Sequence, residues 1–492
     1  MKKVIVPNRG EIAVRIARAC REMGIVSVLA HAESDDIRFT RRFFDETVSL
    51  GSGDVRATYL DVGKVVDAAR ASGADALHPG YGFLSERAEL AAACEEAKIV
   101  FVGPKAKSIA AMGSKAASRQ LMQRQGVPVV PGYDGEDQNV NTLTIEAEGI
   151  GYPLLVKASA GGGGKGMKIV RRPEELIAAV ESARREAGKA FGNDRLLLER
   201  YIEEPRHVEF QVFGDGRGNL VHLFERDCSI QRRHQKVVEE SPAPRYSEEL
   251  RCRMATAAIA AARGVDYENA GTVEFILTPE NDFYFLEMNT RLQVEHPVTE
   301  LVTGVDLVRA QIEVAGGAPL PWTQEQLTQR GHAIEVRVYA EDPDDRFLPQ
   351  TGRIARYAEP TGPGVRVDAG IASGSEVGMT FDPMLAKLIC YAGTREFCID
   401  RLDRALRDYV ILGTKTNVSW LRRVVTHSAF RDGRVSTRFL ADHESDLKRT
   451  IPAVVPLLAA ALAATPHTKR EQSSAKAEGA VSVWDALGNW GR

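Results

Sequence analysis

The segment from Phe283 to Pro297 combines a strand pattern with side chains suited to binding a cation and an anion. It reads Phe-Tyr-Phe-Leu-Glu-Met-Asn-Thr-Arg-Leu-Gln-Val-Glu-His-Pro, and its aromatic and aliphatic start predicts a strand. Strand side chains alternate between two faces. One face is therefore expected to carry Phe283, Phe285, Glu287, Asn289 and Arg291.

A second predicted strand, residues 270–277, precedes this segment, and turn-forming residues join the two. The resulting hairpin would place Glu274 directly opposite Glu287. Like charges that face each other across strands are destabilising, so a cation is expected between them. With the Asn289 amide they form an all-oxygen donor set suited to Mg²⁺, or Mn²⁺, completed by phosphate oxygens. The alternative is two carboxylates splayed into solvent.

A glycine-rich segment, residues 161–166, lies between two predicted strands. Its spacing matches a dinucleotide-binding fingerprint, but that fingerprint requires a helix after the loop. A Walker A loop is also excluded, because Ser159 and Gly166 stand where Gly and Ser or Thr are required. A glycine hairpin remains, whose free N–H groups can close over phosphates. The alternative, a mobile surface hairpin, is disfavoured by the conformational entropy of four consecutive glycines.

The composition excludes several classes of protein. The 492 residues are 44% hydrophobic and carry a net charge of −3, with 64 basic and 67 acidic residues. This size allows several domains, and the charge balance gives no reason to expect nucleic acid or an anionic membrane as a partner. The basic run 225–236 is flanked by acidic residues, which favours a small anion over nucleic acid. Six scattered cysteines and an N-terminus without a targeting pattern predict a cytoplasmic protein.

Periodicity predicts the elements that would position these side chains. Residues 3–113 alternate strands (4–6, 26–31, 74–78, 100–102) with helices (11–23 and from 86), which is typical of a parallel α/β sheet. Later strands are expected at 127–131, 153–157, 167–170, 207–213 and 220–224, and helices at 248–263, 395–410 and 415–426. Residues 331–395 are predicted to be β-rich, with Glu335, Arg337 and Tyr339 on one strand face.

Taken together, these motifs resemble the biotin carboxylases, which are ATP-grasp ligases. The resemblance covers residues 3 to about 445. It rests on Asn8–Ile12, His78–Glu86, Met112–Lys115, the glycine hairpin, Glu225–Lys236, Glu287–Pro297 and Phe381–Met384, in this order. Two departures, Ala160 and Lys165, should leave a working loop because glycines and a positive charge remain.

The resemblance implies that ATP activates bicarbonate as carboxyphosphate and that the carboxyl then passes to N1′ of biotin. Glu295 would be the general base, with a pKa raised by the neighbouring anion. Arg291, Gln293, the Val294 backbone and Lys236 would hold bicarbonate. Arg337 would stabilise the biotin enolate, and Tyr81, Gly82 and Glu86 would border the biotin pocket. An Arg291–Glu295 ion pair is a structural alternative for Arg291.

The resemblance also implies a nucleotide site and a metal site. The phosphates would contact Lys115, Lys157, Gly162, Gly163 and Gly164. The adenosine part would contact Glu199, Ile202, His207, Gln231 and His234. Magnesium would be held by Glu274, Glu287 and Asn289.

The implied architecture is an α/β protein of several parts. An N-terminal Rossmann-like parallel α/β domain is expected at 1–113 and an ATP-grasp domain with a mobile glycine-rich lid (about 131–203) at 114–330. A C-terminal α+β domain would span 331–445, followed by an Ala-rich helix, linker and Trp-containing tail at 446–492.

The expected partners are a separate biotin carboxyl carrier protein or domain and a carboxyltransferase subunit, because the sequence has no biotin-attachment motif. The chain then resembles the first part of acyl-CoA carboxylase alpha chains. Pro363 stands where related bacterial subunits have a dimer-interface Phe, which puts a homodimer in doubt. Alternatives are a carbamoyl-phosphate or purine-pathway ATP-grasp ligase, and a nucleotide-binding regulatory subunit.

Overall fold

The computed structural model describes residues 1–159, 167–233 and 235–449, and residues 1–448 of it form one compact unit. The glycines 162–164, His234 and the predicted tail from 450 onwards therefore lie outside the described residues. Within the described ranges, no helix combines the length and apolar character that a bilayer crossing requires.

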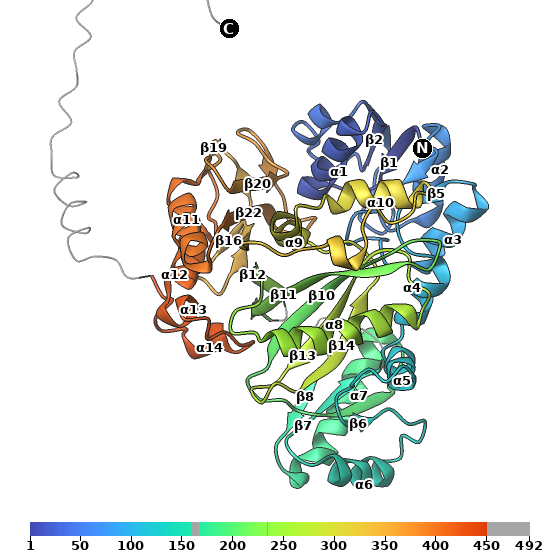
Figure 1. The fold of residues 1–492 in the computed structure, drawn as a ribbon, viewed down its shortest axis with the longest axis vertical. Coiled ribbons are helices and arrows are strands. Elements are labelled where there is room, and N and C mark those ends of the chain that lie inside the picture. The colour runs from blue at the N-terminus through green and yellow to red at the C-terminus, as the bar shows by residue number, and fades with distance from the viewer. Residues whose placement is uncertain (160–166, 234, 450–492) are drawn as a thin grey trace, which may run out of the picture. The chain divides into compact units, whose positions relative to one another are not determined.

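Five parallel strands form the N-terminal sheet in the order β3-β2-β1-β4-β5, which confirms the predicted parallel α/β region (Figure 1). Helices α1 and α10 pack on one face, and α2 and α3 on the other. The bounds are β1 Lys3–Val6, α1 Gly10–Glu22, β2 Val26–His31, 3₁₀-helix Thr40–Phe43, β3 Glu46–Ser49, α2 Val62–Ala71, β4 Ala76–Leu77, α3 Ala88–Glu96, β5 Val100–Phe101 and α4 Ala106–Met112.

A four-stranded antiparallel sheet, β6-β9-β7-β8, packs against α6 and α7 at one end of the unit (Figure 1). The predicted strand 127–131 is wrong: it makes a single bridge, Val129 to Phe285, because Pro128 and Pro131 have no N–H to donate. The bounds are α5 Lys115–Arg124, β6 Gly132–Tyr133, α6 Val140–Ile150, β7 Leu154–Ala158, β8 Lys168–Val170, 3₁₀-helix Pro173–Glu175, α7 Leu176–Phe191 and β9 Leu196–Arg200.

An eight-stranded antiparallel sheet, β14-β13-β10-β11-β12-β15-β22-β20, runs through the middle of the chain and into its C-terminal part. Helix α8 packs on its apolar face, and Ser247 caps that helix as predicted, accepting from the Leu250 N–H at 3.2 Å. The bounds are β10 Arg206–Gly214, β11 Leu220–Arg232, β12 Gln235–Ser241, α8 Glu248–Arg263, β13 Asn269–Leu277, β14 Phe283–Asn289, β15 His332–Tyr339, β20 Val365–Ala369 and β22 Met384–Ala392.

The remaining elements surround the C-terminal half of this sheet, where α11 and α12 contribute to its core. They are α9 His296–Thr303, α10 Leu307–Ala315, 3₁₀-helix Gln324–Gln326, β16 Glu341–Asp342, β17 Leu348–Pro349, β18 Gly352–Arg353, β19 Arg356–Ala358, β21 Glu376–Val377, α11 Arg395–Asp408, β23 Val410–Leu412, α12 Val418–Thr426, α13 Ser428–Arg431 and α14 Phe439–Asp442.

Candidate active site

The β13–β14 hairpin places Glu274 opposite Glu287, as predicted. The predicted single face is wrong, however, because the pairing register shifts between these strands and Leu286 is an extra residue. A one-residue insertion reverses the side-chain alternation beyond it. Phe283 and Phe285 therefore face the apolar core under α8, whereas Glu287 lies on the opposite face.

Glu274 is the centre of a dense polar cluster. Its carboxylate accepts hydrogen bonds from Asn289 Nδ2 at 2.8 Å, from Lys236 Nζ at 2.9 Å and from Gln293 Nε2 at 3.0 Å. Its second oxygen lies 2.9 Å from His207 Nε2. Burial raises the pKa of Glu274, but Lys236 and His207 outweigh it and hold the pKa well below its usual range.

Lys236 connects Glu274, a predicted metal ligand, to Glu295, the predicted general base. Its ammonium lies 2.9 Å from Glu274 and 2.7 Å from Glu295, and it also contacts Glu209 at 2.5 Å. Burial alone would lower the pKa of Lys236, but the three carboxylates raise it well above its usual value. The ammonium is therefore charged, and it joins its own strand β12 to strands β10 and β13 and to the loop before α9.

Glu295 is fully buried and paired with two cations, Lys236 and, at 3.0 Å, Arg337. The expected rise of its pKa is not found in this structure. Burial raises the pKa, but Lys236 and Arg337 lower it well below the usual range. Glu295 is thus ionised and able to accept a proton. Its basicity would increase when an anion draws part of the cationic charge away.

Arg291 does not pair with Glu295, which was the structural alternative. Its Nε donates to Glu86 at 2.9 Å, and its terminal nitrogens donate to Gln293 at 2.8 Å and Asn289 at 3.0 Å. The Glu86 carboxylate also accepts from the Thr290 N–H at 3.1 Å. Arg291 therefore links a predicted biotin-pocket residue to the predicted bicarbonate site.

Two of the predicted phosphate ligands, Lys115 and Lys157, lie at one small cavity of about 30 Å³, which Glu287 also lines. Lys115 begins helix α5 and Lys157 lies near the end of β7, both as predicted. Lys157 Nζ lies 2.5 Å from Glu199, which comes from the paired strand β9. Both lysines and the Glu287 carboxylate line this cavity, so predicted phosphate ligands and a predicted metal ligand lie side by side.

The other predicted residues lie on the elements around this cluster. Tyr81 and Gly82 follow strand β4, and the Tyr81 carbonyl accepts from Asn8 Nδ2 at 2.8 Å. Ile202 follows strand β9, and Gln231 pairs with Lys236 in the β11–β12 register. The Val294 carbonyl accepts from Lys387 Nζ at 2.7 Å.

The acidic pair fits a divalent cation. Burial and the neighbouring Glu274 raise the pKa of Glu287, whereas Lys115 and His207 lower it, and a bound divalent cation would favour the ionised form of both carboxylates. Among the residues that the structure describes, none donates a hydrogen bond to the Glu287 carboxylate, whereas the Asn289 Oδ1 accepts from Arg291. Asn289 would therefore have to release Arg291 before its amide oxygen could bind a metal.

Sequence reasoning missed Glu209, Arg226 and Lys387. Glu209 and Arg226 are fully buried and paired at 2.6 Å, and Glu209 also supports Lys236. A signal was present in β10, where His207, Glu209 and Gln211 alternate with apolar residues. Polar residues repeated at every second position of a strand indicate a buried polar face.

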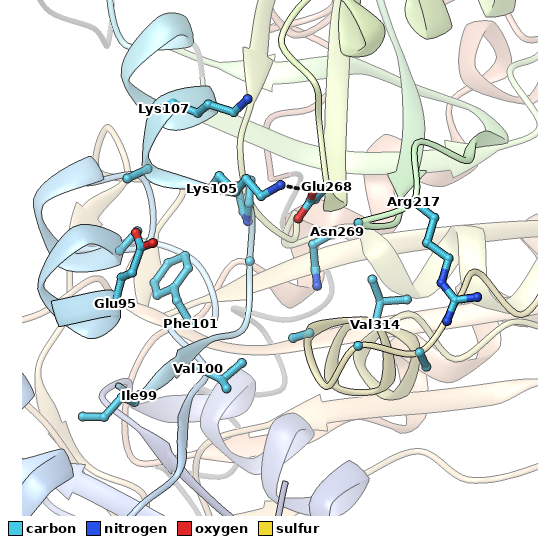
Figure 2. Close-up of a pocket in the computed structure, with 18 residues that line it drawn as sticks. Glu95, Ile99, Val100, Phe101, Lys105, Lys107, Arg217, Glu268, Asn269 and Val314 are labelled. Carbon is cyan, nitrogen blue, oxygen red and sulfur yellow. Dashed lines mark hydrogen bonds and ion pairs between the residues drawn. The ribbon is translucent and has the colours of Figure 1, made fainter. Parts of the chain in front are cut away.

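A larger cavity, of about 730 Å³, lies away from these residues, between the N-terminal sheet and the turn joining β10 and β11 (Figure 2). Its charged lining includes Lys105, which pairs with Glu268, and Lys107, which pairs with Asp266 at 2.9 Å. No predicted site residue lines it. The volume of a cavity alone therefore does not identify the predicted active site.

A second group of potential metal ligands, His427, His443 and Asp446, lies near α13. The His427 Nδ1 accepts from the Ala429 N–H at 3.2 Å, so its proton is on Nε2, which lies 3.4 Å from Asp446. A metal-bound histidine normally donates through its second nitrogen. This group is therefore a helix cap rather than a metal site.

Three family models match the chain in sequence order. They are the biotin carboxylase N-terminal domain at residues 1–109, the ATP-binding domain of the carbamoyl-phosphate synthase L chain at 114–323, and the biotin carboxylase C-terminal domain at 335–442.

Similar proteins with curated names include two kinds of carboxylase chain. The mitochondrial methylcrotonoyl-CoA carboxylase subunit alpha of Dictyostelium discoideum is 49% identical over 490 residues, covering 99% of this chain and 70% of that protein. Biotin carboxylase 1 of Bacillus subtilis is 47% identical, covering 90% of this chain and 99% of that protein. The chain spans 61% and 63% of the corresponding alpha subunits of Glycine max and Rattus norvegicus.

Among solved structures, the biotin carboxylase domain of Hydrogenobacter thermophilus 2-oxoglutarate carboxylase superposes with a TM-score of 0.86 at 46% identity. It covers 92% of this chain and 99% of that domain, and it was solved as a dimer with MgADP, ADP and bicarbonate. The Campylobacter jejuni biotin carboxylase, solved as a β,γ-ATP complex, has a TM-score of 0.87 at 41% identity, covering 90% and 99% of the two chains.

Proposed function

This chain belongs to the biotin carboxylase family of ATP-dependent, ATP-grasp ligases, and on that premise we propose how its residues carboxylate biotin with bicarbonate. In the proposed reaction bicarbonate loses its proton to Glu295, and its oxygen attacks the γ-phosphorus of ATP. ADP leaves and carboxyphosphate forms. The carboxyl group then passes to N1′ of biotin, and the phosphate released from carboxyphosphate takes the N1′ proton.

The observation that carries the proposal is the position of Lys236. Its ammonium lies 2.9 Å from Glu274, in the acidic pair, and 2.7 Å from Glu295, the proposed base. The metal-and-phosphate part and the proton-accepting part therefore belong to one site. If these side chains faced separate surfaces, they could not act on one triphosphate and one bicarbonate.

The proposed roles follow from charge and placement. Lys115 and Lys157 hold the phosphates, and the cations Arg291 and Lys236 hold bicarbonate beside Glu295. Binding of bicarbonate would compete with the Glu86 carboxylate for Arg291, since the two are 2.9 Å apart.

A magnesium ion bound to Glu274 and Glu287 would supply charge screening between the phosphates. The glycine hairpin, Glu199, Ile202, His207, Gln231 and His234 are proposed to complete the nucleotide site.

Arg337 is proposed to stabilise negative charge on the ureido oxygen of biotin. Its guanidinium is positioned by Glu239 at 2.6 Å and contacts Glu295 at 3.0 Å. Preorganised charge of this kind typically contributes about 10²–10³ in rate. Tyr81, Gly82 and Glu86 would border the biotin ring.

Biotin is proposed to arrive on a carrier protein or domain outside the described residues, and a carboxyltransferase would use the carboxylated product. This makes the reaction the first half-reaction of an acyl-CoA carboxylase. The similarity to methylcrotonoyl-CoA carboxylase alpha subunits supports this assignment.

The test measures ADP release with and without bicarbonate, and carboxylation of free biotin. Glu295→Gln should lower both activities by about 10²-fold or more, because it removes the base. Arg337→Ala should lower carboxylation by about 10²–10³-fold and ATP cleavage less. It should not spare ATP cleavage entirely, since Arg337 contacts Glu295.

Arg251→Ala is the control, because that guanidinium pairs with Glu225 and does not contact the site. The proposal fails if ATP cleavage by the parent chain is independent of bicarbonate, or if Glu295→Gln keeps the parent rate.

A further inference from the structure

Lys387 is a fully buried lysine in the middle of strand β22, and the proposed chemistry does not use it. It pairs in the sheet register with Arg337 on β15. Its side chain leaves the sheet and reaches the loop before helix α9, which carries the proposed base. A lysine is almost never fully buried unless its charge is paired, so its partners indicate its role.

Three separate segments meet at the Lys387 ammonium. The Val294 carbonyl accepts its hydrogen bond at 2.7 Å, the Glu11 carboxylate of α1 lies 3.4 Å away, and the Asp368 carboxylate of β20 lies 3.9 Å away. Burial lowers the pKa of Lys387, but Glu11, Glu335 and Asp368 outweigh this and raise it. The ammonium therefore remains charged, which strengthens its hydrogen bond to the carbonyl.

The carbonyl that accepts the hydrogen bond from Lys387 belongs to the peptide group between Val294 and Glu295. The neighbouring loop carbonyls are held locally: Leu292 O accepts from Arg291 at 3.2 Å, and Gln293 O lies 2.8 Å from His296 Nδ1. Val294 O is held instead by a residue 93 positions away in the chain. Because a peptide group is planar, holding this oxygen also restricts the orientation of the Glu295 nitrogen and Cα.

We propose that Lys387 is a positioning residue for the general base. From the C-terminal sheet it fixes the orientation of the Val294–Glu295 peptide group and thereby the direction of the Glu295 carboxylate. The inference rests on the proposed function, since it assigns a task toward the same base. Lys387 also lies 6.0 Å from the ring of Tyr81, so it stands between the proposed bicarbonate loop and the proposed biotin pocket.

Stability alone does not account for this lysine. Burying an ion pair costs desolvation energy, and apolar residues of similar volume often replace such pairs without loss of stability. A methionine at 387 would fill similar space in the sheet without the charge or the donor. The buried charge is explained if Lys387 is needed to position the loop that carries Glu295.

The experiment compares Lys387→Met with Arg395→Met in the full chain. Arg395 is a partly buried cation of the same C-terminal region that pairs with Glu240 at 2.7 Å and does not contact the loop. Lys387→Met should lower kcat/KM for bicarbonate in ATP cleavage by about 10²-fold, the typical effect of displacing a reacting group by about 1 Å. KM for ATP should change less than about twofold, and Arg395→Met should keep the parent kinetics.

Lys387→Gln keeps an N–H donor without the charge and should recover part of the lost activity. If Lys387→Met shows no cooperative thermal transition, the kcat/KM for bicarbonate of Lys387→Gln is compared with that of Arg395→Gln. The inference is overturned if the Lys387 variant keeps the parent kcat/KM for bicarbonate, if both members of a pair lose activity equally, or if KM for ATP rises in step. Absence of bicarbonate-dependent cleavage in the parent chain would instead contradict the proposed function.

Discussion

At the residue scale, the site is a set of buried charges whose pKa values depend on one another. Glu295 is held ionised by Lys236 and Arg337, whereas Glu287 has a raised pKa because burial and Glu274 disfavour its charge. The same type of residue is therefore proposed as a proton acceptor in one place and as a metal ligand in another. The difference comes from the neighbours, which the strand and loop register brings together.

A buried carboxyl near Lys387 makes stability depend on pH. Burial raises the pKa of Glu11 from 4.5 to about 7. Between these values the folded chain binds more protons at Glu11 than the unfolded chain does, so stability falls as pH rises through this range. The melting temperature of the parent should therefore drop more between pH 5 and pH 8 than that of Glu11→Gln, whose side chain does not titrate.

Thermal unfolding at the two pH values checks this, with Glu396→Gln on the exposed side of α11 as the control. Parallel pH dependences for the parent and Glu11→Gln would contradict it. Glu239, whose pKa is also raised to about 7, should leave a residual pH dependence in Glu11→Gln.

At the element scale, the extra residue in β14 decides which face of the sheet carries Glu287, a predicted metal ligand. Strand alternation alone predicts that Glu287 shares a face with Phe283 and Phe285, and this is wrong because the register shifts at Leu286. The alternation of β15 needed no such correction, and Glu335 and Arg337 face the site side together. A bulge is a property of the paired strands, so periodicity within one strand does not reveal it.

Deletion of Leu286 should remove the bulge but leave Glu287 on the site face, because Glu287 would then follow the core residue Phe285 directly. A bulge bends its strand and re-aims the neighbouring side chain, so the deletion should displace the Glu287 carboxylate and lower bicarbonate-dependent ATP cleavage by about 10²-fold. Leu286→Ala keeps the residue count and the alternation, so it should lose far less activity. Equal losses in the deletion and the substitution would contradict the role of the bulge.

At the scale of the whole molecule, every site residue discussed here lies in the compact unit from Met1 to Lys448. A chain that ends after Lys448 should therefore keep the parent rate of bicarbonate-dependent ATP cleavage within about twofold, since no described contact of the site would be removed. ADP release and the melting temperature of the shortened chain check this. A loss of more than tenfold in a folded chain would show that later residues contribute to the site.

The domain boundaries at 113, 330 and 445 stay predictions, as does the doubt about a homodimer. The similar Hydrogenobacter domain was solved as a dimer, whereas Pro363 argued against one from the sequence. Sedimentation of the purified chain distinguishes a monomer from a dimer.

The amino-acid sequence by itself determined the parallel N-terminal sheet, the Glu274–Glu287 pairing and the order of the motifs that indicate a biotin carboxylase. These follow from local periodicity, turn chemistry and residue types. The tertiary structure alone decided that Lys236 joins Glu274 to Glu295, that Arg291 pairs with Glu86, and that Lys387 reaches the Val294 carbonyl. Each of these contacts joins segments distant in sequence, and burial then sets the charge each group holds, which no local pattern encodes.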